Sequence, residues 1–202
     1  MRTPGTGLTF ASVILLAMLF STLSLCRSVL ADAPTFDRAE AIRAFVAATE
    51  KNHISRRPLD NQRAAMWFDR FLEDLDPQRM YFLAADSAKF RPFRSRIHDL
   101  ALRGDTRFAD EVRRRYAERV RDACSYAATF LSAEHDFSAD EEFPRLYRTY
   151  ASDQKELRER WRLRIKAELL VEKVHGTPLS DARKWLAERY RRIERQAREM
   201  TD

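Results

Sequence analysis

The sequence predicts an all-α protein, a single bundle or bowl of about six helices behind an N-terminal signal peptide. Three observations support this prediction. Apolar residues recur at helical spacing along most of the chain after residue 36. The 202 residues include only 4 glycines and 7 prolines, a composition that suits long helices better than a turn-rich β-sandwich. The sequence also lacks alternating, strand-like runs and Asn-Gly or Asp-Gly hairpin signals.

Residues 1–31 have the pattern of a secretory signal peptide. Arg2 precedes an uncharged apolar run over residues 8–25, and small residues near Ala31 suit a cleavage site. Because this run approaches the roughly 18 residues that span a membrane, an uncleaved signal anchor is the alternative. We expect an exported chain, periplasmic or otherwise extracytoplasmic, that meets the membrane only through an uncleaved leader.

The first two helices are predicted from apolar spacing and from the residues that bound it. Residues 37–40 resemble a capping box, so we expect a helix from there to about Lys51, with Ile42, Phe45, Val46 and Thr49 at helical spacing. A second helix follows Pro58 and ends at Asp76-Pro77, because proline disfavours the helical conformation of the residue before it. Its apolar face comprises Ala64, Trp67, Phe68, Phe71, Leu72 and Leu75.

The next two helices are predicted on either side of Gly104. Asp86 is placed to cap a third helix, in which Pro92 is tolerated only near the start, and Gly104 is placed to end it. Asp105 can cap a long fourth helix. The apolar residues are Phe90, Phe93, Ile97 and Leu100 in the third helix, and Phe108, Val112, Tyr116, Val120, Cys124, Ala127 and Leu131 in the fourth.

A polar connector over residues 135–144 separates these helices from the last two. Residues 138–141 repeat the capping-box pattern, which favours a short helical turn there. Ser152 is expected to open the fifth helix and Ser180 to cap the sixth, with a stop at residues 175–178 between them. The apolar residues are Leu157, Trp161, Ile165 and Leu169 in the fifth helix, and Leu186, Tyr190, Ile193 and Ala197 in the sixth.

Two patterns resemble catalytic or metal sites. Ser152 and Lys155 have Ser-x-x-Lys spacing, but the partner motifs of such enzymes are missing, so we interpret Ser152 as a helix cap. Glu172 and His175 have the Glu-x-x-His spacing of di-iron bundles, which need a second such pair. We therefore predict no metal, no cofactor and no catalytic residue. The other histidines stand without a second ligand at zinc-site spacing: His53, His98 and His135.

The formal net charge of +6 raises the question of an anionic partner. Arginine runs such as residues 113–115 alternate with Glu111 and Glu118 at helical distances, which favours local ion pairs over a surface of one sign. We predict no nucleic-acid partner, and we keep a basic envelope protein that binds anionic surfaces as an alternative. Cys124 is the single cysteine outside the leader, and its place on an apolar stripe predicts burial.

Two stretches of the chain closely resemble the opening of tail-specific proteases, also called carboxy-terminal processing proteases. They are residues 52–60, with Asn52-His53 and Arg56-Arg57-Pro58, and residues 68–83, with Asp76-Pro77-Gln78-Arg79. The resemblance continues more loosely to about residue 190. Ile54 departs from it, since the family tends to have an aromatic residue there. We assign residues 36–195 to the N-terminal helical domain of this family and residues 196–202 to a C-terminal tail.

The resemblance implies a place in the turnover of envelope proteins selected by their C-termini. Family members continue into a PDZ domain and a peptidase domain with a serine nucleophile and a lysine base, and no residue of that dyad can be carried over to this chain. We therefore expect a non-catalytic scaffold or interaction module that assembles with the PDZ or peptidase domain of a tail-specific protease, or with another envelope protein. A remnant of a truncated protease with no present activity is the alternative.

The two most specific stretches also supply candidate protein-contact residues. A stiff Pro77 turn would present an arginine fork and an amphipathic aromatic side chain beside a rigid helix. An internal role is equally open, in which Asp76 ends a helix, Arg79 pairs with an acid and residues 81–83 fill the core. The candidates are Asn52, His53, Arg56, Arg57, Asp76, Gln78, Arg79 and Tyr81.

Overall fold

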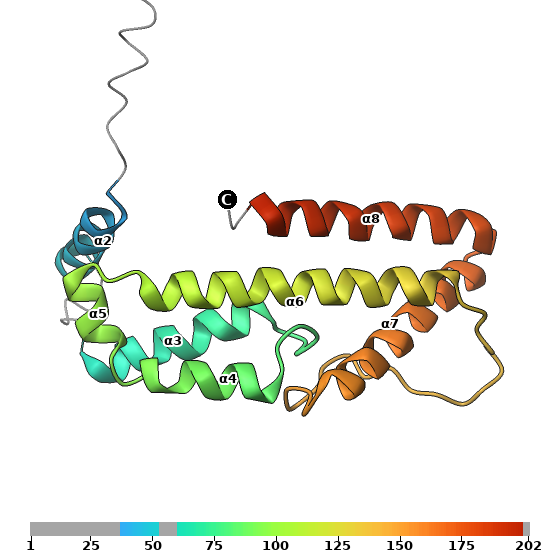
Figure 1. Ribbon diagram of the computed structural model, residues 1–202, viewed down its shortest axis with the longest axis horizontal. Helices are drawn as coiled ribbons and strands as arrows, with labels where there is room; N and C mark the ends of the chain where they lie inside the picture. The colour runs from blue at the N-terminus through green and yellow to red at the C-terminus, as the bar shows by residue number, and fades with distance from the viewer. Residues whose placement is uncertain (1–36, 53–59, 200–202) are drawn as a thin grey trace, which may run out of the picture. The chain divides into compact units, whose positions relative to one another are not determined.

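The structure is a computed structural model that describes residues 37–52 and 60–199 (Figure 1). Within these ranges strand-like pairing is limited to one isolated bridge between Leu83 and Ala151, which confirms the all-α prediction. The predicted signal peptide lies outside the described residues. The helices are α2 (Arg38–Asn52), α3 (Asn61–Leu75), α4 (Ala84–Phe90), the 3-10 helix η1 (Arg91–Phe93), α5 (Ile97–Arg103), α6 (Arg107–Ser132), α7 (Gln154–Val174) and α8 (Leu179–Glu199).

The long helix α6 carries most of the packing. Its C-terminal part packs with α7 and α8, and its N-terminal part covers α3 and α4 (Figure 1). Small residues of α6 such as Ala123 and Ala127 are fully buried in the first of these cores, where they let neighbouring helices approach closely. The half-buried ring of Tyr116 packs against both cores, so α6 joins them into one continuous interior.

The segment predicted as a single helix from Asp86 to Gly104 is instead divided into α4, η1 and α5. Pro92 explains the division, because proline lacks an N–H and its ring obstructs the preceding turn. Asp86 lies within the first turn of α4 rather than at the cap, and its Oδ2 accepts the N–H of Leu83 at 3.0 Å. Gly104 ends α5 with φ of 67°, as predicted.

Three predicted helix starts differ from the observed ones by one or two residues. Ser, Thr and Asp all suit the position before a helix, so spacing alone did not select the right one. The carboxylate of Asp153, which accepts the N–H of Glu156 at 2.8 Å, takes the capping role on α7. The observed caps are Thr106 in place of Asp105 for α6 and Asp153 in place of Ser152 for α7, whereas α8 begins at Leu179, so Ser180 lies within its first turn instead of capping it.

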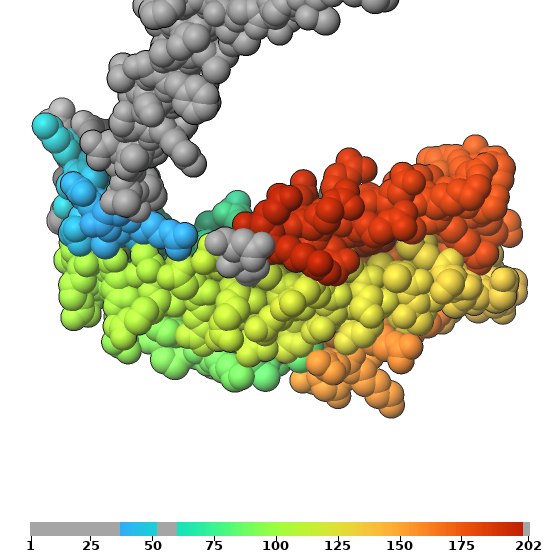
Figure 2. All heavy atoms as spheres, turned by 45° about the horizontal axis from the view of Figure 1, so that its top comes forward, coloured from blue at the N-terminus to red at the C-terminus, as the bar shows by residue number. Residues whose placement is uncertain are grey.

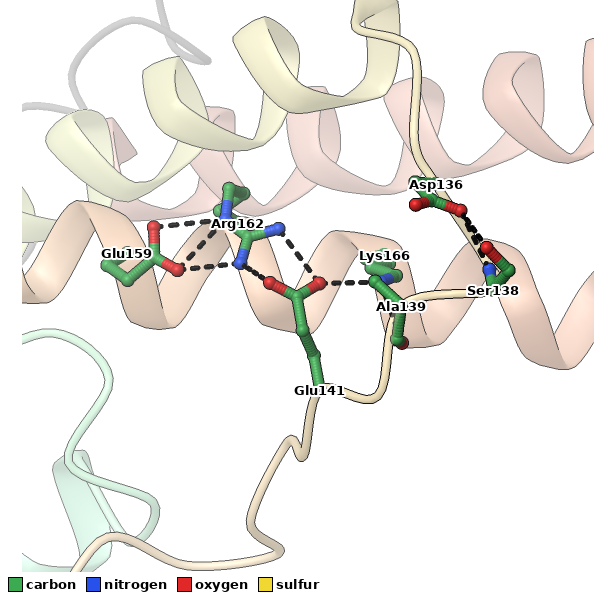
Figure 3. Close-up of polar contacts among 7 residues, drawn as sticks. All are labelled: Asp136, Ser138, Ala139, Glu141, Glu159, Arg162 and Lys166. Atoms are coloured by element: carbon green, nitrogen blue, oxygen red, sulfur yellow. Dashed lines mark hydrogen bonds and ion pairs between the residues drawn. The ribbon is translucent and has the colours of Figure 1, made fainter.

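The connector between α6 and α7 contains no helix, so the predicted helical turn at residues 138–141 is wrong. The Oδ1 atom of Asp136 accepts the N–H and the hydroxyl of Ser138 at 2.9 and 2.6 Å, which closes a local turn. Glu141 does not fold back onto its own backbone. Its carboxylate instead reaches α7 and pairs with Arg162 and with Lys166, whose Nζ lies 2.5 Å away (Figure 3).

The helices end where the sequence patterns end, with one extension. α8 continues to Glu199 and so includes the first part of the segment predicted as a C-terminal tail. Among the described helices, none combines the length and the apolar character that a membrane span requires.

Candidate functional site

Half of the predicted contact residues lie at the end of α2 or beyond it. Asn52 is the last residue of α2, and His53, Arg56 and Arg57 lie outside the described residues. The other half, Asp76, Gln78, Arg79 and Tyr81, lie together in the turn that follows α3.

Asp76 organises this turn from the inside. Its carboxylate is 1% exposed and accepts three backbone N–H groups, from Met80 at 2.7 Å, Tyr81 at 3.0 Å and Phe82 at 2.9 Å. Burial raises the pKa of Asp76, although the three donors favour the charged carboxylate. Asp76 therefore shapes the chain that leads out of α3.

Arg79 and Gln78 tie the turn to the connector before α7. The Nη1 atom of Arg79 donates to the carbonyl of Tyr147 at 2.8 Å, and its guanidinium lies 5.6 Å from the centre of the Tyr150 ring. Arg79 has φ of 54°, an uncommon backbone conformation for a residue other than glycine. Gln78 donates from Nε2 to the carbonyl of Arg145 at 3.3 Å. The acid expected to pair with Arg79 is thus replaced by a backbone carbonyl and a tyrosine ring.

Tyr81 and the residues beside it join the turn to the core. The Tyr81 ring lies 5.4 Å from that of Tyr116 and 5.8 Å from that of Trp161, and burial raises its pKa. Trp161 also donates from Nε1 to the carbonyl of Met80 at 2.7 Å. Arg160, the residue before it, donates from Nη1 to the carbonyl of Arg79 at 3.0 Å. These contacts favour the internal role of the turn, and a partner contact at its exposed edge stays a prediction.

A groove of about 430 Å³ lies beside the turn. Its charged residues largely neutralise one another: Arg94, for example, pairs with both carboxylate oxygens of Asp69 at 2.8 and 2.7 Å. The mixture of signs favours no particular class of charged ligand. The lining residues are Phe68, Asp69, Leu72, Glu73, Asp76, Arg79, Ser87, Arg91, Arg94 and Tyr150.

On the other flank of α3, aromatic side chains are exposed. Phe45 of α2 is 63% exposed, and Trp67 and Phe71 of α3 are 40% and 38% exposed. The rings of Phe45 and Trp67 lie 6.3 Å apart, and Phe71 contacts the buried Phe108 edge-on at 5.9 Å. We call Phe45, Trp67 and Phe71 the aromatic row. Their helical spacing predicted that these residues belong to apolar helix faces, but it gave no sign of their exposure.

The motifs that resembled catalytic sites have structural roles. The hydroxyl and the N–H of Ser152 both donate to Oε2 of Glu156 at 2.8 Å, so this serine supports the start of α7 rather than pairing with Lys155. Glu172 accepts the Thr177 hydroxyl at 3.0 Å where the chain leaves α7. Within residues 37–52 and 60–199, no group of three or more His, Cys, Asp or Glu side chains is arranged to hold a metal ion.

Comparison with known families agrees with the resemblance carried by residues 52–60 and 68–83. The family model of the tail specific protease N-terminal domain matches residues 45–202, a span that includes α3 to α8 and the Asp76 turn. A comparison with curated protein sequences finds no match. The chain therefore belongs to the tail-specific protease N-terminal domain family.

Proposed function

We propose that this chain is a non-catalytic helical scaffold that binds the PDZ or peptidase domain of a tail-specific protease, and that the aromatic row is its docking surface. The observation that carries the proposal is the exposure of three neighbouring aromatic side chains, Phe45, Trp67 and Phe71, on two packed helices. Contiguous exposed apolar surface of this kind marks interaction sites on soluble proteins.

The row has the composition of a protein-binding hot spot. Tryptophan and other aromatic residues dominate the energetics of interfaces, because each buries a large apolar area at a small cost in side-chain entropy. Beside it, Arg70 pairs with Asp74 at 2.9 Å on the solvent face of α3. Such charged pairs suit the polar rim of an interface.

The proposed compartment is extracytoplasmic. It is supported by the signal-peptide pattern of residues 1–31 and by family membership, since the tail-specific proteases that the chain resembles act on envelope proteins. Among the described residues, the N–H and the hydroxyl of Ser152 both bind Glu156 at the start of α7 rather than Lys155, which supports a role without peptide-bond chemistry.

Titration of the purified protein against the PDZ and peptidase domains of a tail-specific protease tests this function. We expect Trp67→Ala to weaken binding at least about 30-fold, because truncating a hot-spot residue costs roughly 2 kcal/mol or more. Trp185→Ala is the matched control: Trp185 of α8 is also 40% exposed but lies outside the aromatic row. Isothermal titration calorimetry measures both affinities, and thermal unfolding checks that both variants fold.

Two results would overturn the proposal. If the wild-type protein does not bind at high micromolar concentration, the chain is not a docking module for the protease tested. That result would support the alternative, a remnant without present activity. If Trp67→Ala and Trp185→Ala weaken binding equally, the aromatic row is not the docking surface.

A further inference from the structure

A second groove, of about 280 Å³, lies between α6 and α8. The two helices run beside each other over much of their length (Figures 1 and 2). Cys124 and Leu131 of α6 and Ala187 of α8 give the groove an apolar lining. Ser125 and Ala128, which line it from α6, are small and exposed, so the backbone of another helix can approach closely here.

Two arginines without partners lie at this groove, one from each helix. Arg121 of α6 and Arg191 of α8 are exposed, and within the described residues neither has a hydrogen bond, ion pair or ring contact. The acid beside them, Glu194, already pairs with Arg198 at 2.8 Å. The groove therefore carries positive charge that the described residues do not neutralise.

Other arginines of the same two helices are already paired. On α6, Arg119 pairs with Asp86 at 2.7 Å, and on α8, Arg189 pairs with Glu168 at 2.5 Å. Each wall of the groove thus supplies one guanidinium that no acid among the described residues pairs with. A planar guanidinium binds a carboxylate through two parallel hydrogen bonds, so two of them favour two carboxylates held at a fixed spacing.

We propose that the groove between α6 and α8 docks an acidic amphipathic helix of a partner protein. An aliphatic side chain of that helix lies on the apolar lining at Leu131 and Ala187, and carboxylates on its flanks bind Arg121 and Arg191. This is the helix-in-groove mode of recognition, with charge complementarity selecting acidic partners. The proposal uses no residue of the aromatic row and does not depend on the function proposed above.

Designed peptides test the proposal without knowledge of the natural partner. The probe is an 18-residue fluorescent helix with leucines on one face and glutamates on both flanks, and its neutral analogue carries glutamine in place of each glutamate. We expect the acidic peptide to bind at least tenfold more tightly than the neutral one by fluorescence anisotropy. Added salt should reduce this difference, because exposed charge pairs are screened.

Charge-reversal variants locate the binding. The double variant Arg121→Glu/Arg191→Glu should weaken binding of the acidic peptide at least tenfold. The matched control is Arg192→Glu/Arg195→Glu, which makes the same change of charge at exposed arginines of α8 that do not line the groove. This control should retain most of the affinity. Ala128→Trp, at an exposed helical position, should weaken binding by filling the groove without changing charge.

Three outcomes would overturn the proposal. If the acidic and neutral peptides bind equally well, carboxylates are not what the groove recognises. If both double variants lose the same affinity for the acidic peptide, only the overall charge of the protein matters. If the Arg121→Glu/Arg191→Glu variant loses binding to vesicles of anionic lipid but keeps the peptide, the arginines serve a membrane surface instead.

Discussion

At the scale of single residues, Asp76 determines how the chain leaves α3. Its two carboxylate oxygens accept the N–H groups of Met80, Tyr81 and Phe82, three donors that would otherwise be left without partners close to the core. An unsatisfied buried donor costs more than a typical hydrogen bond contributes. The turn therefore depends on one side chain.

We predict that Asp76→Ala lowers the free energy of unfolding by at least about 3 kcal/mol, because three N–H groups lose their acceptor at about 1–3 kcal/mol each. Asp74→Ala is the matched control, since Asp74 makes an exposed ion pair with Arg70 and exposed pairs contribute about 0–1 kcal/mol. Urea unfolding followed by circular dichroism measures both values. Similar losses in the two variants would contradict the central role of Asp76.

The sequence predicted the position of this turn but not its partners. Asp76-Pro77 marked the end of a helix because the conformational restriction by proline is local. The partners of Arg79 are the carbonyl of Tyr147 and the ring of Tyr150, far along the chain, and local spacing holds no information about them. The prediction that Arg79 pairs with an acid failed for this reason.

At the scale of elements, the contact between α2 and the end of α5 depends on Gly104. This glycine has φ of 67°, and a Cβ atom there would lie 2.5 Å from the carbonyl oxygen of Ala39 and 2.8 Å from its Cα. Those atoms belong to the helical backbone of α2, which cannot move aside without moving the helix. Gly104 thus both ends α5 and leaves room for α2.

We predict that Gly104→Ala destabilises the protein by more than Gly176→Ala does. Gly176 also has positive φ, 83°, but a Cβ atom there would meet nothing within 4 Å, so its substitution costs roughly 1–2 kcal/mol of backbone strain alone. At Gly104 the clash with Ala39 should add about 1–3 kcal/mol. Urea unfolding measures the free energy of unfolding of both variants. Equal losses would show that α2 can move away from a Cβ atom at residue 104 without loss of stability.

Apolar periodicity predicted which segments are helical and roughly where they begin and end. It did not predict where a helix is interrupted or which side of an apolar stripe stays exposed. Pro92 divides the predicted third helix. The two pieces stay in place without a continuous helix between them, because Phe90 and Leu100 are both buried in the same core. Trp67 and Phe71 share the spacing of the buried Phe68 and Leu72. Periodicity defines a broad apolar stripe, and the packed neighbours decide which flank of the stripe remains exposed.

At the scale of the whole molecule, ion pairs add to the apolar contacts that hold the connector between α6 and α7. The connector between α6 and α7 is fastened to α7 by Glu141, which pairs with Arg162 and Lys166, while Arg162 also pairs with Glu159 at 2.7 Å (Figure 3). The two cations lower the pKa of Glu141 from 4.5 to about 2. Folding is therefore linked to the ionisation of this carboxyl group.

The sign of this linkage follows from the lowered pKa. A carboxyl group with a lower pKa in the folded state than in the unfolded state stabilises the fold above the unfolded value, and this contribution is lost as pH falls through the folded value. For Glu141 the contribution is complete above about pH 4.5 and decreases from there toward about pH 2. Glutamine resembles the protonated carboxyl group, so Glu141→Gln should be less stable than the wild type at pH 7.

We predict that the stability difference between the wild type and Glu141→Gln shrinks as pH falls from about 4.5 toward about 2. Urea midpoints measured across this range test the trend. Glu142→Gln is the control, because Glu142 is an exposed neighbour in the same connector and has no ion pair in the described part of the chain. The stability difference between Glu142→Gln and the wild type should stay small and should not change with pH. A constant difference for Glu141→Gln would mean that the Arg162 and Lys166 pairs do not hold the connector in solution.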